Sequence, residues 1–314
     1  MPKYLLAVAF AAALICPAAA QDYPNRVVQI INPYPAGSTT DALARALAVG
    51  LSSRLGQQFV VINRPGAGGG LGAASVARAE PDGYNLLFAP ALVLSVLPAA
   101  RNDAGYDAEA LIPVCQTFSN AMALAVRPDS PFKSLKDVVE AARARPDQLN
   151  YGHQGPSTIP HLAMEEFLDH AKLKINGIPF RGDPAVMTDL LGGRLDIGSI
   201  VLGSATGQNI RLIGIFAEER QPAFPDVPTV KEQGFDVSPT SFGGILAPAK
   251  TPAPVLAKLA SACEGAAKDE AYATTAKRAA QPDKYFDDRS GFAARLARDI
   301  EVKKRLLARM PKQD

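Results

Sequence analysis

The chain has 314 residues, of which 47% are hydrophobic and 20% are charged. It can therefore bury a large core, and chains of this size tend to divide into two domains. The formal net charge of only +2 implies neither a nucleic-acid partner nor an anionic membrane surface.

The N-terminal segment has the pattern of a secretory signal peptide. Lys3 precedes an apolar run, and the small residues Ala18-Ala19-Ala20 are typical of a cleavage site ahead of Gln21. The run is shorter than the roughly 20 residues that a membrane-spanning helix needs. We therefore expect residues 1–20 to be removed and the mature protein to be soluble in the periplasm.

The next part of the chain alternates strand and helix patterns. A helix should begin near Ser38, because leucines recur there at every fourth position, and it should end at Gly56. A glycine-rich loop at 66–72 should lead into a short helix. Strands are expected at 27–31, 59–62 and 86–88. Such alternation favours a mostly parallel sheet with helices on both faces.

A similar pattern starts again after the apolar run 122–126. Helices should begin at Ser134 and Pro160, and strands are expected at 149–151 and 175–180. After 245–247 the pattern predicts three closing helices, which should return to the first domain. We therefore predict a two-lobed α/β fold, with residues 21–124 and 246–314 in the first lobe and 125–245 in the second.

Two cysteines remain after the signal peptide. Cys115 lies in an apolar strand-like run, whereas Cys263 lies on an alanine-rich helix. A disulfide could form outside the cytoplasm, but nothing in the pattern indicates one. We expect two separate buried thiols.

Ligands of open parallel sheets bind outside the carboxyl ends of the strands, so the loops there are candidate sites. The loop 33–41 places a glycine and the hydroxyl residues Ser38, Thr39 and Thr40 at a helix start. The unpaired backbone N–H groups of such a start, together with the helix dipole, favour an anion. The alternative is a helix cap without any ligand.

The glycine-rich loop has a weak likeness to a dinucleotide-binding site. Gly68 to Ala73 match G-x-G-x-x-A, but three residues separate the preceding strand from the glycines, and no acid follows about 20 residues later. A nicotinamide-dependent oxidoreductase is therefore a distant alternative. Glycines that allow a close approach of the backbone explain the loop better, and we expect no cofactor.

The segment 151–161 is the second candidate for an anion site. It contains Ser157 and Thr158 ahead of a new helix start. We expect His153 and His161 to donate or accept hydrogen bonds rather than to ligate a metal, since no residue near them has metal-ligand spacing. There is no G-x-S-x-G motif, and we expect no catalysis. Arg181 could pair with a ligand carboxylate, or it could be a solvated or interdomain charge.

Together these loops resemble the receptors of tripartite tricarboxylate transporters, the Bug-type periplasmic solute-binding proteins. The resemblance covers nearly the whole mature chain, and it depends on the order and spacing of many short stretches. These stretches are Tyr23-Pro24, Pro33 to Asp41 with Ala44-Arg45, Gly56-Gln57, Asn63 to Gly69, Pro81 to Tyr84, Tyr151-Gly152, His161 to Ala163, Gly182 with Pro184-Ala185, Asp189-Leu190 with Gly192-Gly193, Pro225 to Thr229 and Ala247-Pro248.

The resemblance implies a type II-like periplasmic binding protein, expected as a monomer, whose lobes close on a small organic carboxylate. It also implies a membrane permease as partner. The alternative is a periplasmic carboxylate sensor that signals to a membrane kinase, which would share this fold. Ser38, His153 and a short segment between Asp196 and Arg211 depart from the usual family pattern. The candidate ligand contacts are Tyr34, Ala36, Gly37, Ser38, Thr39, Thr40, Asp41, Gly68, His153, Ser157, Thr158, His161, Arg181 and Asp183.

Overall fold

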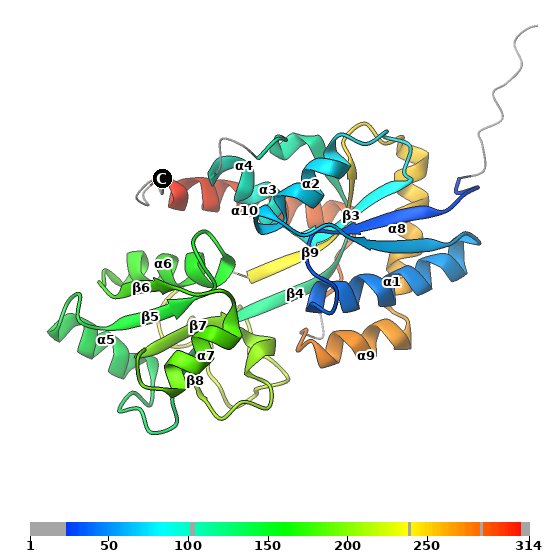
Figure 1. Cartoon of the computed structure of the whole chain (residues 1–314). Helices are drawn as coiled ribbons and strands as arrows, with labels where there is room; N and C mark the ends of the chain where they lie inside the picture. The colour runs from blue at the N-terminus through cyan, green and yellow to red at the C-terminus, as the bar shows by residue number, and fades with distance from the viewer. Residues whose placement is uncertain (1–22, 101–103, 238–239, 283–284, 309–314) are drawn as a thin grey trace, which may run out of the picture.

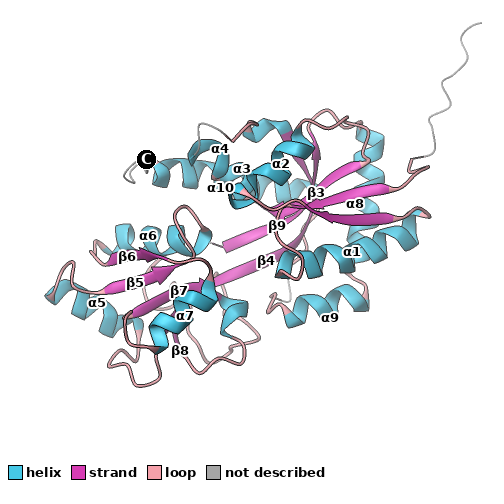
Figure 2. Cartoon of the chain, viewed as in Figure 1, coloured by secondary structure: helices cyan, strands magenta, loops and turns pink. Residues whose placement is uncertain are grey.

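The computed structural model describes residues 23–100, 104–237, 240–282 and 285–308. The predicted signal peptide lies outside these residues. The described part forms two lobes that are joined by a continuous, curled β-sheet with the strand order β2-β1-β3-β9-β4-β7-β5-β6, and β8 pairs with β4 (Figure 1). Helices flank the strands of both lobes (Figure 2).

The first lobe begins with a parallel β-sheet. Its strands are β1 (Val28–Asn32), β2 (Phe59–Asn63) and β3 (Asn85–Pro90), and β1 pairs in parallel with both others. The helices that connect and follow these strands are α1 (Thr39–Leu55), α2 (Gly70–Ala77), α3 (Leu92–Ser95) and α4 (Leu97–Ala100).

Helix α1 begins and ends where the sequence predicts. Ser38 is its N-cap, and Gly56 adopts the left-handed conformation at its C-cap with φ 69°. Leu43, Leu47 and Leu51 are fully buried and pack in one core with Val28 and Ile30 of β1 and with the closing helix α8. Ile31, the next residue of β1, belongs to the core on the opposite face, as strand alternation requires.

One long strand connects the lobes. The sequence suggests separate apolar runs before and after Ser119, but the structure has a single strand β4 (Leu111–Val126). Up to Ala121 it pairs antiparallel with β9 (Thr240–Pro248), and from Met122 onward it pairs with strands of the second lobe. The predicted lobe boundaries at 124 and 246 are not tested by these pairings and stay a prediction.

The second lobe repeats the strand and helix alternation. Its strands are β5 (Asn150–His153), β6 (Asn176–Pro179), β7 (Ile197–Val201) and β8 (Arg211–Phe216). Its helices are α5 (Leu135–Ala144), α6 (Ile159–Ala171), α7 (Asp183–Leu191) and the short 3₁₀ helix η3 (Leu202–Ala205). Strand β5 pairs in parallel with β6 and β7, whereas β7 and β8 run antiparallel to β4.

Three helices close the chain, as predicted. They are α8 (Ala253–Ala267), α9 (Glu270–Arg278) and α10 (Arg289–Leu307). Helices α8 and α9 share a core with α1, and α10 contributes Phe292 and Leu296 to the core on the other face of the first lobe.

The expectation of two separate thiols is wrong. Cys115 of β4 and Cys263 of α8 form a disulfide, with their Cα atoms 6.5 Å apart. Both side chains are buried in the first-lobe core, where α8 packs against the strand. The sequence pattern identified the two elements but not their contact, which depends on the tertiary fold.

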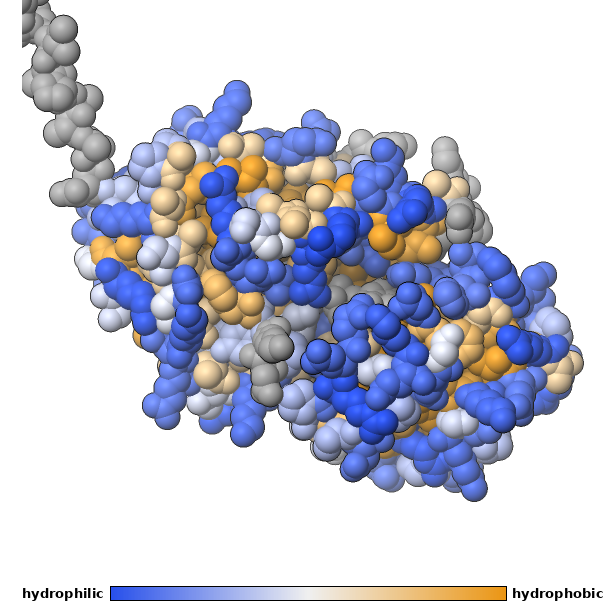
Figure 3. All heavy atoms as spheres, turned by 180° about the vertical axis from the view of Figure 1, so that it is seen from behind, coloured by the Kyte–Doolittle hydropathy of each residue, from blue (hydrophilic) through white to orange (hydrophobic). Residues whose placement is uncertain are grey.

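Hydrophilic side chains cover most of the face shown in Figure 3, over both lobes, and hydrophobic side chains show between them in smaller patches. Among the helices of the described ranges, none combines the length and the apolar character that crossing a bilayer requires.

Candidate functional site: a cavity between the two lobes

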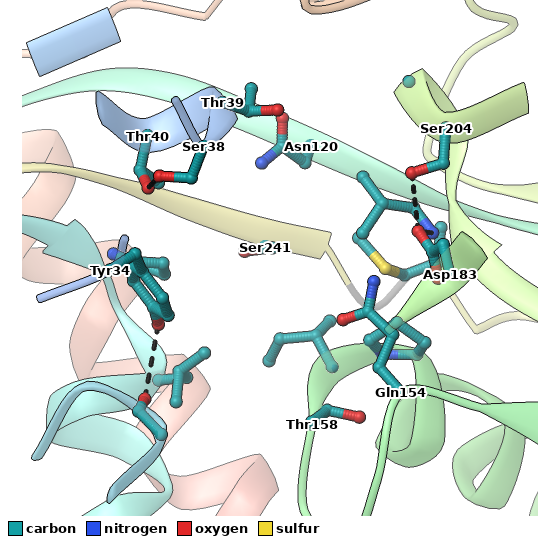
Figure 4. A pocket seen from close by; sticks show the side chains of 18 of the residues that line it. Tyr34, Ser38, Thr39, Thr40, Asn120, Gln154, Thr158, Asp183, Ser204 and Ser241 are labelled. Carbon is teal, nitrogen blue, oxygen red and sulfur yellow. Dashed lines mark hydrogen bonds between the residues drawn. The ribbon is translucent and has the colours of Figure 1, made fainter. Parts of the chain in front are cut away.

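A cavity of about 510 Å³ lies between the lobes. This volume is within the range of small-molecule sites. Figure 4 shows Ser38, Thr39 and Thr40 on one side of it and Gln154, Thr158, Asp183 and Ser204 on the other. The polar lining residues are Tyr34, Ser38, Thr39, Thr40, Asn120, Gln154, Ser157, Thr158, Asp183, Ser204, Ser241 and Arg278.

The first-lobe side of the cavity is the start of α1. The Ser38 hydroxyl accepts a hydrogen bond from the amide of Asp41 at 3.3 Å, which caps the helix. The amides of Thr39 and Thr40 belong to the first turn and have no intrahelical acceptor. Nothing else in the described ranges accepts from these two amides. They are therefore available to an anion, which the positive end of the helix dipole also favours.

Asp41 holds the loop that precedes α1. Its buried carboxylate accepts hydrogen bonds from the Gly37 amide at 2.9 Å, from Asn63 Nδ2 at 2.8 Å and from Arg45 Nε at 3.1 Å. Burial would raise the pKa of this carboxyl, but the hydrogen bonds hold the pKa below its ordinary value. Asp41 is not among the lining residues, and neither are the exposed Ala36 and Gly37.

The second-lobe side includes the start of α6. Thr158 occupies the N-cap position, and its hydroxyl donates to the Gly155 carbonyl at 2.7 Å. The amides of Ile159 and His161 lie in the first turn and have no intrahelical acceptor, whereas Pro160 has no N–H to donate. Ile159 lines the cavity, so the start of α6 offers an unpaired amide on the side opposite α1, whereas His161 is not among the lining residues.

Two buried histidines support this loop from behind. His161 Nδ1 accepts a hydrogen bond from the Ser157 amide at 3.1 Å, and His153 Nδ1 lies 2.9 Å from the carbonyl oxygen of Gly155. Ser157 itself has a positive φ of 58°. Neither histidine is among the lining residues, so both act on the loop rather than on the cavity. In the described ranges, no group of His, Cys, Asp and Glu could hold a metal ion.

The loop before α7 places an acid, not a base, at the cavity. Arg181 is exposed and is not among the lining residues. Asp183, the first residue of α7, is 3% exposed and does line the cavity. Burial raises the pKa of its carboxyl.

Several lining residues do not follow from the loop patterns of the sequence. Asn120 of β4 is the register partner of Ser241 of β9, although the two residues are far apart in the chain. Arg278, the last residue of α9, is also among the lining residues. No sequence motif marks these positions, and strand register and helix packing alone bring them to the cavity.

The chain resembles known proteins over most of its length. Residues 43–308 match the family described as the tripartite tricarboxylate transporter family receptor. A UPF0065 protein of Bordetella pertussis is 32% identical over 81% of this chain and 80% of its own length. The protein BugT of the same organism is 35% identical over 71% of each chain.

Two solved structures of the same fold contain carboxylates. An R. palustris protein solved with adipate is 25% identical, with a TM-score of 0.78, and the match covers 91% of this chain and 98% of that one. MatC from Rhodopseudomonas palustris, solved with bound malate, is 26% identical, with a TM-score of 0.75, over 91% of this chain and 100% of that one. The family match, the relatives and the shared two-lobed fold agree with the resemblance seen in the sequence, and the chain belongs to the tripartite tricarboxylate transporter receptor family of Bug-type solute-binding proteins.

Proposed function

We propose that the chain is a periplasmic solute-binding protein that captures a small organic carboxylate between its lobes and delivers it to a tripartite tricarboxylate-type permease. The observation that carries this proposal is the position of two helix starts, those of α1 and α6, on opposite sides of one cavity. Each belongs to a different lobe, and each presents first-turn amides without a partner among the described residues.

The strength of such a site agrees with reversible capture. A hydrogen bond to a charged group contributes about 1.5 to 3 kcal/mol. Three of them, from the amides of the lining residues Thr39, Thr40 and Ile159, would contribute about 4.5 to 9 kcal/mol, which is comparable with the roughly 8 kcal/mol of a micromolar ligand. Because amides carry no formal charge, binding of the ligand carboxylate at the two helix starts avoids the desolvation cost of a buried ion pair at that end of the site.

The donor amides belong to different lobes, those of α1 to the first and that of α6 to the second, and this arrangement favours closure of the lobes on the ligand. The lobes are connected by β4 and by the chain that leads into β9. A carboxylate that accepts hydrogen bonds from both lobes binds the closed arrangement better than the open one, and so it shifts the population toward closure. A permease could then distinguish the loaded protein from the empty one by its shape.

The relatives support the same ligand class and role. Adipate and malate occupy two solved structures that share this fold. The family is described as a receptor of a transporter, and the N-terminal pattern at residues 1–20 predicts export. We assign the protein no catalytic role.

A binding experiment tests the proposal. Titration calorimetry should detect a carboxylate with a Kd on the order of micromolar. Thr39→Phe should weaken this binding at least tenfold, because the side chain would fill the space in front of the α1 amides. Val49→Phe is a matched control, since Val49 is 66% exposed on the same helix and is not a lining residue. Equal affinities of the two variants would contradict the proposed site.

A further inference from the structure

Only one of the two carboxylate oxygens of Asp183 accepts hydrogen bonds from the described residues. Its Oδ2 accepts hydrogen bonds from the Ser204 hydroxyl at 2.6 Å and from the Val201 amide at 3.1 Å. The side-chain amide of Gln154 approaches the carboxylate and favours its charged form. Its Oδ1 is nevertheless buried and has no hydrogen-bond partner among the described residues.

The contacts of Oδ2 explain a structural role, but they do not explain the second oxygen. Holding η3 against the start of α7 needs one acceptor, which an asparagine or a serine could also supply. A buried acceptor without a donor costs about 1 to 3 kcal/mol. Asp183 is only 3% exposed and lies at the cavity that is proposed to hold the ligand (Figure 4). Gln154 lies near the carboxylate but makes no hydrogen bond to Oδ1, so a ligand in the cavity is the remaining source of a donor.

The chemistry of the acid restricts what that donor can be. A second ligand carboxylate next to Asp183 would be repelled by the charge of Asp183, whereas a hydroxyl or an ammonium group would donate to Oδ1. The unpaired amides of α1 and α6 are donors only, so they can hold a carboxylate but not a donor group. The two ends of the site thus require opposite chemistry.

We propose that Asp183 is a specificity-determining residue that selects carboxylates carrying a hydroxyl or an ammonium group. This inference rests on the proposed function, because it takes the starts of α1 and α6 as the carboxylate site. The favoured ligands are hydroxy acids or amino acids, and the corresponding unsubstituted carboxylates bind more weakly.

The test is calorimetry with matched acids that differ in one group. Four sets cover a range of sizes: propionate, lactate and alanine; succinate, malate and aspartate; glutarate, 2-hydroxyglutarate and glutamate; and phenylpropionate, phenyllactate and phenylalanine, with both enantiomers of each chiral acid. In the set that fits the cavity, the wild-type protein should bind the hydroxyl or ammonium member at least tenfold more tightly than the unsubstituted acid. The hydroxyl and ammonium members compared with each other identify the donor.

The variant Asp183→Asn keeps an oxygen for Ser204 and Val201 but turns a donor toward the ligand. It should reduce the preference to less than about threefold while still binding the unsubstituted acid. Asp189→Asn is the control, because Asp189 is on the same helix, pairs with Arg194 and is not a lining residue. Thermal unfolding of both variants reports whether they are folded.

The outcomes distinguish the role of Asp183 from the proposed carboxylate-binding function. If the wild-type protein binds carboxylates without preference, or if Asp183→Asn keeps the preference, the role of Asp183 is overturned and the proposed function stands. If no acid of the four sets binds, the proposed function fails, and the inference fails with it.

Discussion

The imidazole rings of His153 on β5 and His161 on α6 stack with their centroids 4.1 Å apart and their planes at 15°. Burial lowers the pKa of each ring to about 4, and in His153 the neighbouring His161 adds to this effect. Both rings are therefore neutral at neutral pH, and His161 Nδ1 can accept the Ser157 amide.

This pair predicts a loss of stability in mild acid. In the unfolded chain each histidine takes up a proton near pH 6.5, but in the folded protein it does so only near pH 4. The unfolded state binds more protons in this interval, so the free energy of unfolding falls as the pH falls from 6.5 to 4. Urea unfolding should show the wild-type protein losing roughly 2 to 3 kcal/mol per histidine more over this interval than His153→Gln/His161→Gln. Parallel pH profiles would contradict this explanation.

The disulfide between Cys115 and Cys263 should stabilise the first lobe. It joins β4 to α8 across a sequence separation of 148. Reduction, or the variant Cys115→Ala/Cys263→Ala, should lower the free energy of unfolding by about 2 to 4 kcal/mol, chiefly because the unfolded chain becomes less constrained. Urea unfolding with and without dithiothreitol measures the difference. The double variant is the control, since it should not respond to the reductant, and an unchanged wild-type midpoint would refute the prediction.

A buried lysine links the closing helix α10 to α6 of the second lobe. Lys303 Nζ lies 3.8 Å from Glu166 Oε2 and 3.9 Å from Asp299 Oδ1, and its side chain is 1% exposed. Burial raises the pKa of the Glu166 carboxyl. Lys303→Met would leave Glu166 without its cation, and we expect it to cost about 3 kcal/mol of stability.

The matched double variant Lys303→Met/Glu166→Gln should recover most of this loss, because neither buried charge of the pair would then remain. Chemical denaturation of the wild-type protein and the two variants measures both steps. A double variant that is less stable than Lys303→Met would show that packing, rather than the buried charge, is responsible.

Asp41 should affect ligand binding without touching the ligand. Asp41→Ala removes the acceptor of the Gly37 amide and of Asn63, so the loop before α1 loses its fixed shape. We expect carboxylate affinity to fall about tenfold and stability to fall by about 2 kcal/mol. Calorimetry and denaturation of the same sample measure both effects. Full affinity in this variant would mean that the loop does not depend on Asp41.

The sequence predicts the helix ends well, because each helix end depends on a few neighbouring residues. The N-cap Ser38 and the C-cap Gly56 were predicted because a hydroxyl acceptor and a left-handed glycine are requirements of a single helix end. The sequence predicts the long strand β4 only as two runs, because the polar residues Ser119 and Asn120 interrupt its apolar pattern. The strand is continuous because β4 pairs with β9 in its first part and with β7 and β8 in its second part.

The sequence predicts some of the residues that line the cavity and misses others. Eight predicted contacts line the cavity, and they are Tyr34, Ser38, Thr39, Thr40, Gly68, Ser157, Thr158 and Asp183. Most of these belong to loops at helix starts, which a sequence pattern can identify. Asn120, Ser241 and Arg278 were missed because their meeting depends on the register of β4 with β9 and on the packing of α9.

A crystal structure with the best-bound acid of the calorimetric series tests the central claim most directly. We predict closed lobes and a ligand carboxylate whose oxygens accept hydrogen bonds from the amide of Thr39 or Thr40 and from the amide of Ile159. A ligand held by one lobe alone, or a carboxylate bound away from both helix starts, would contradict the account.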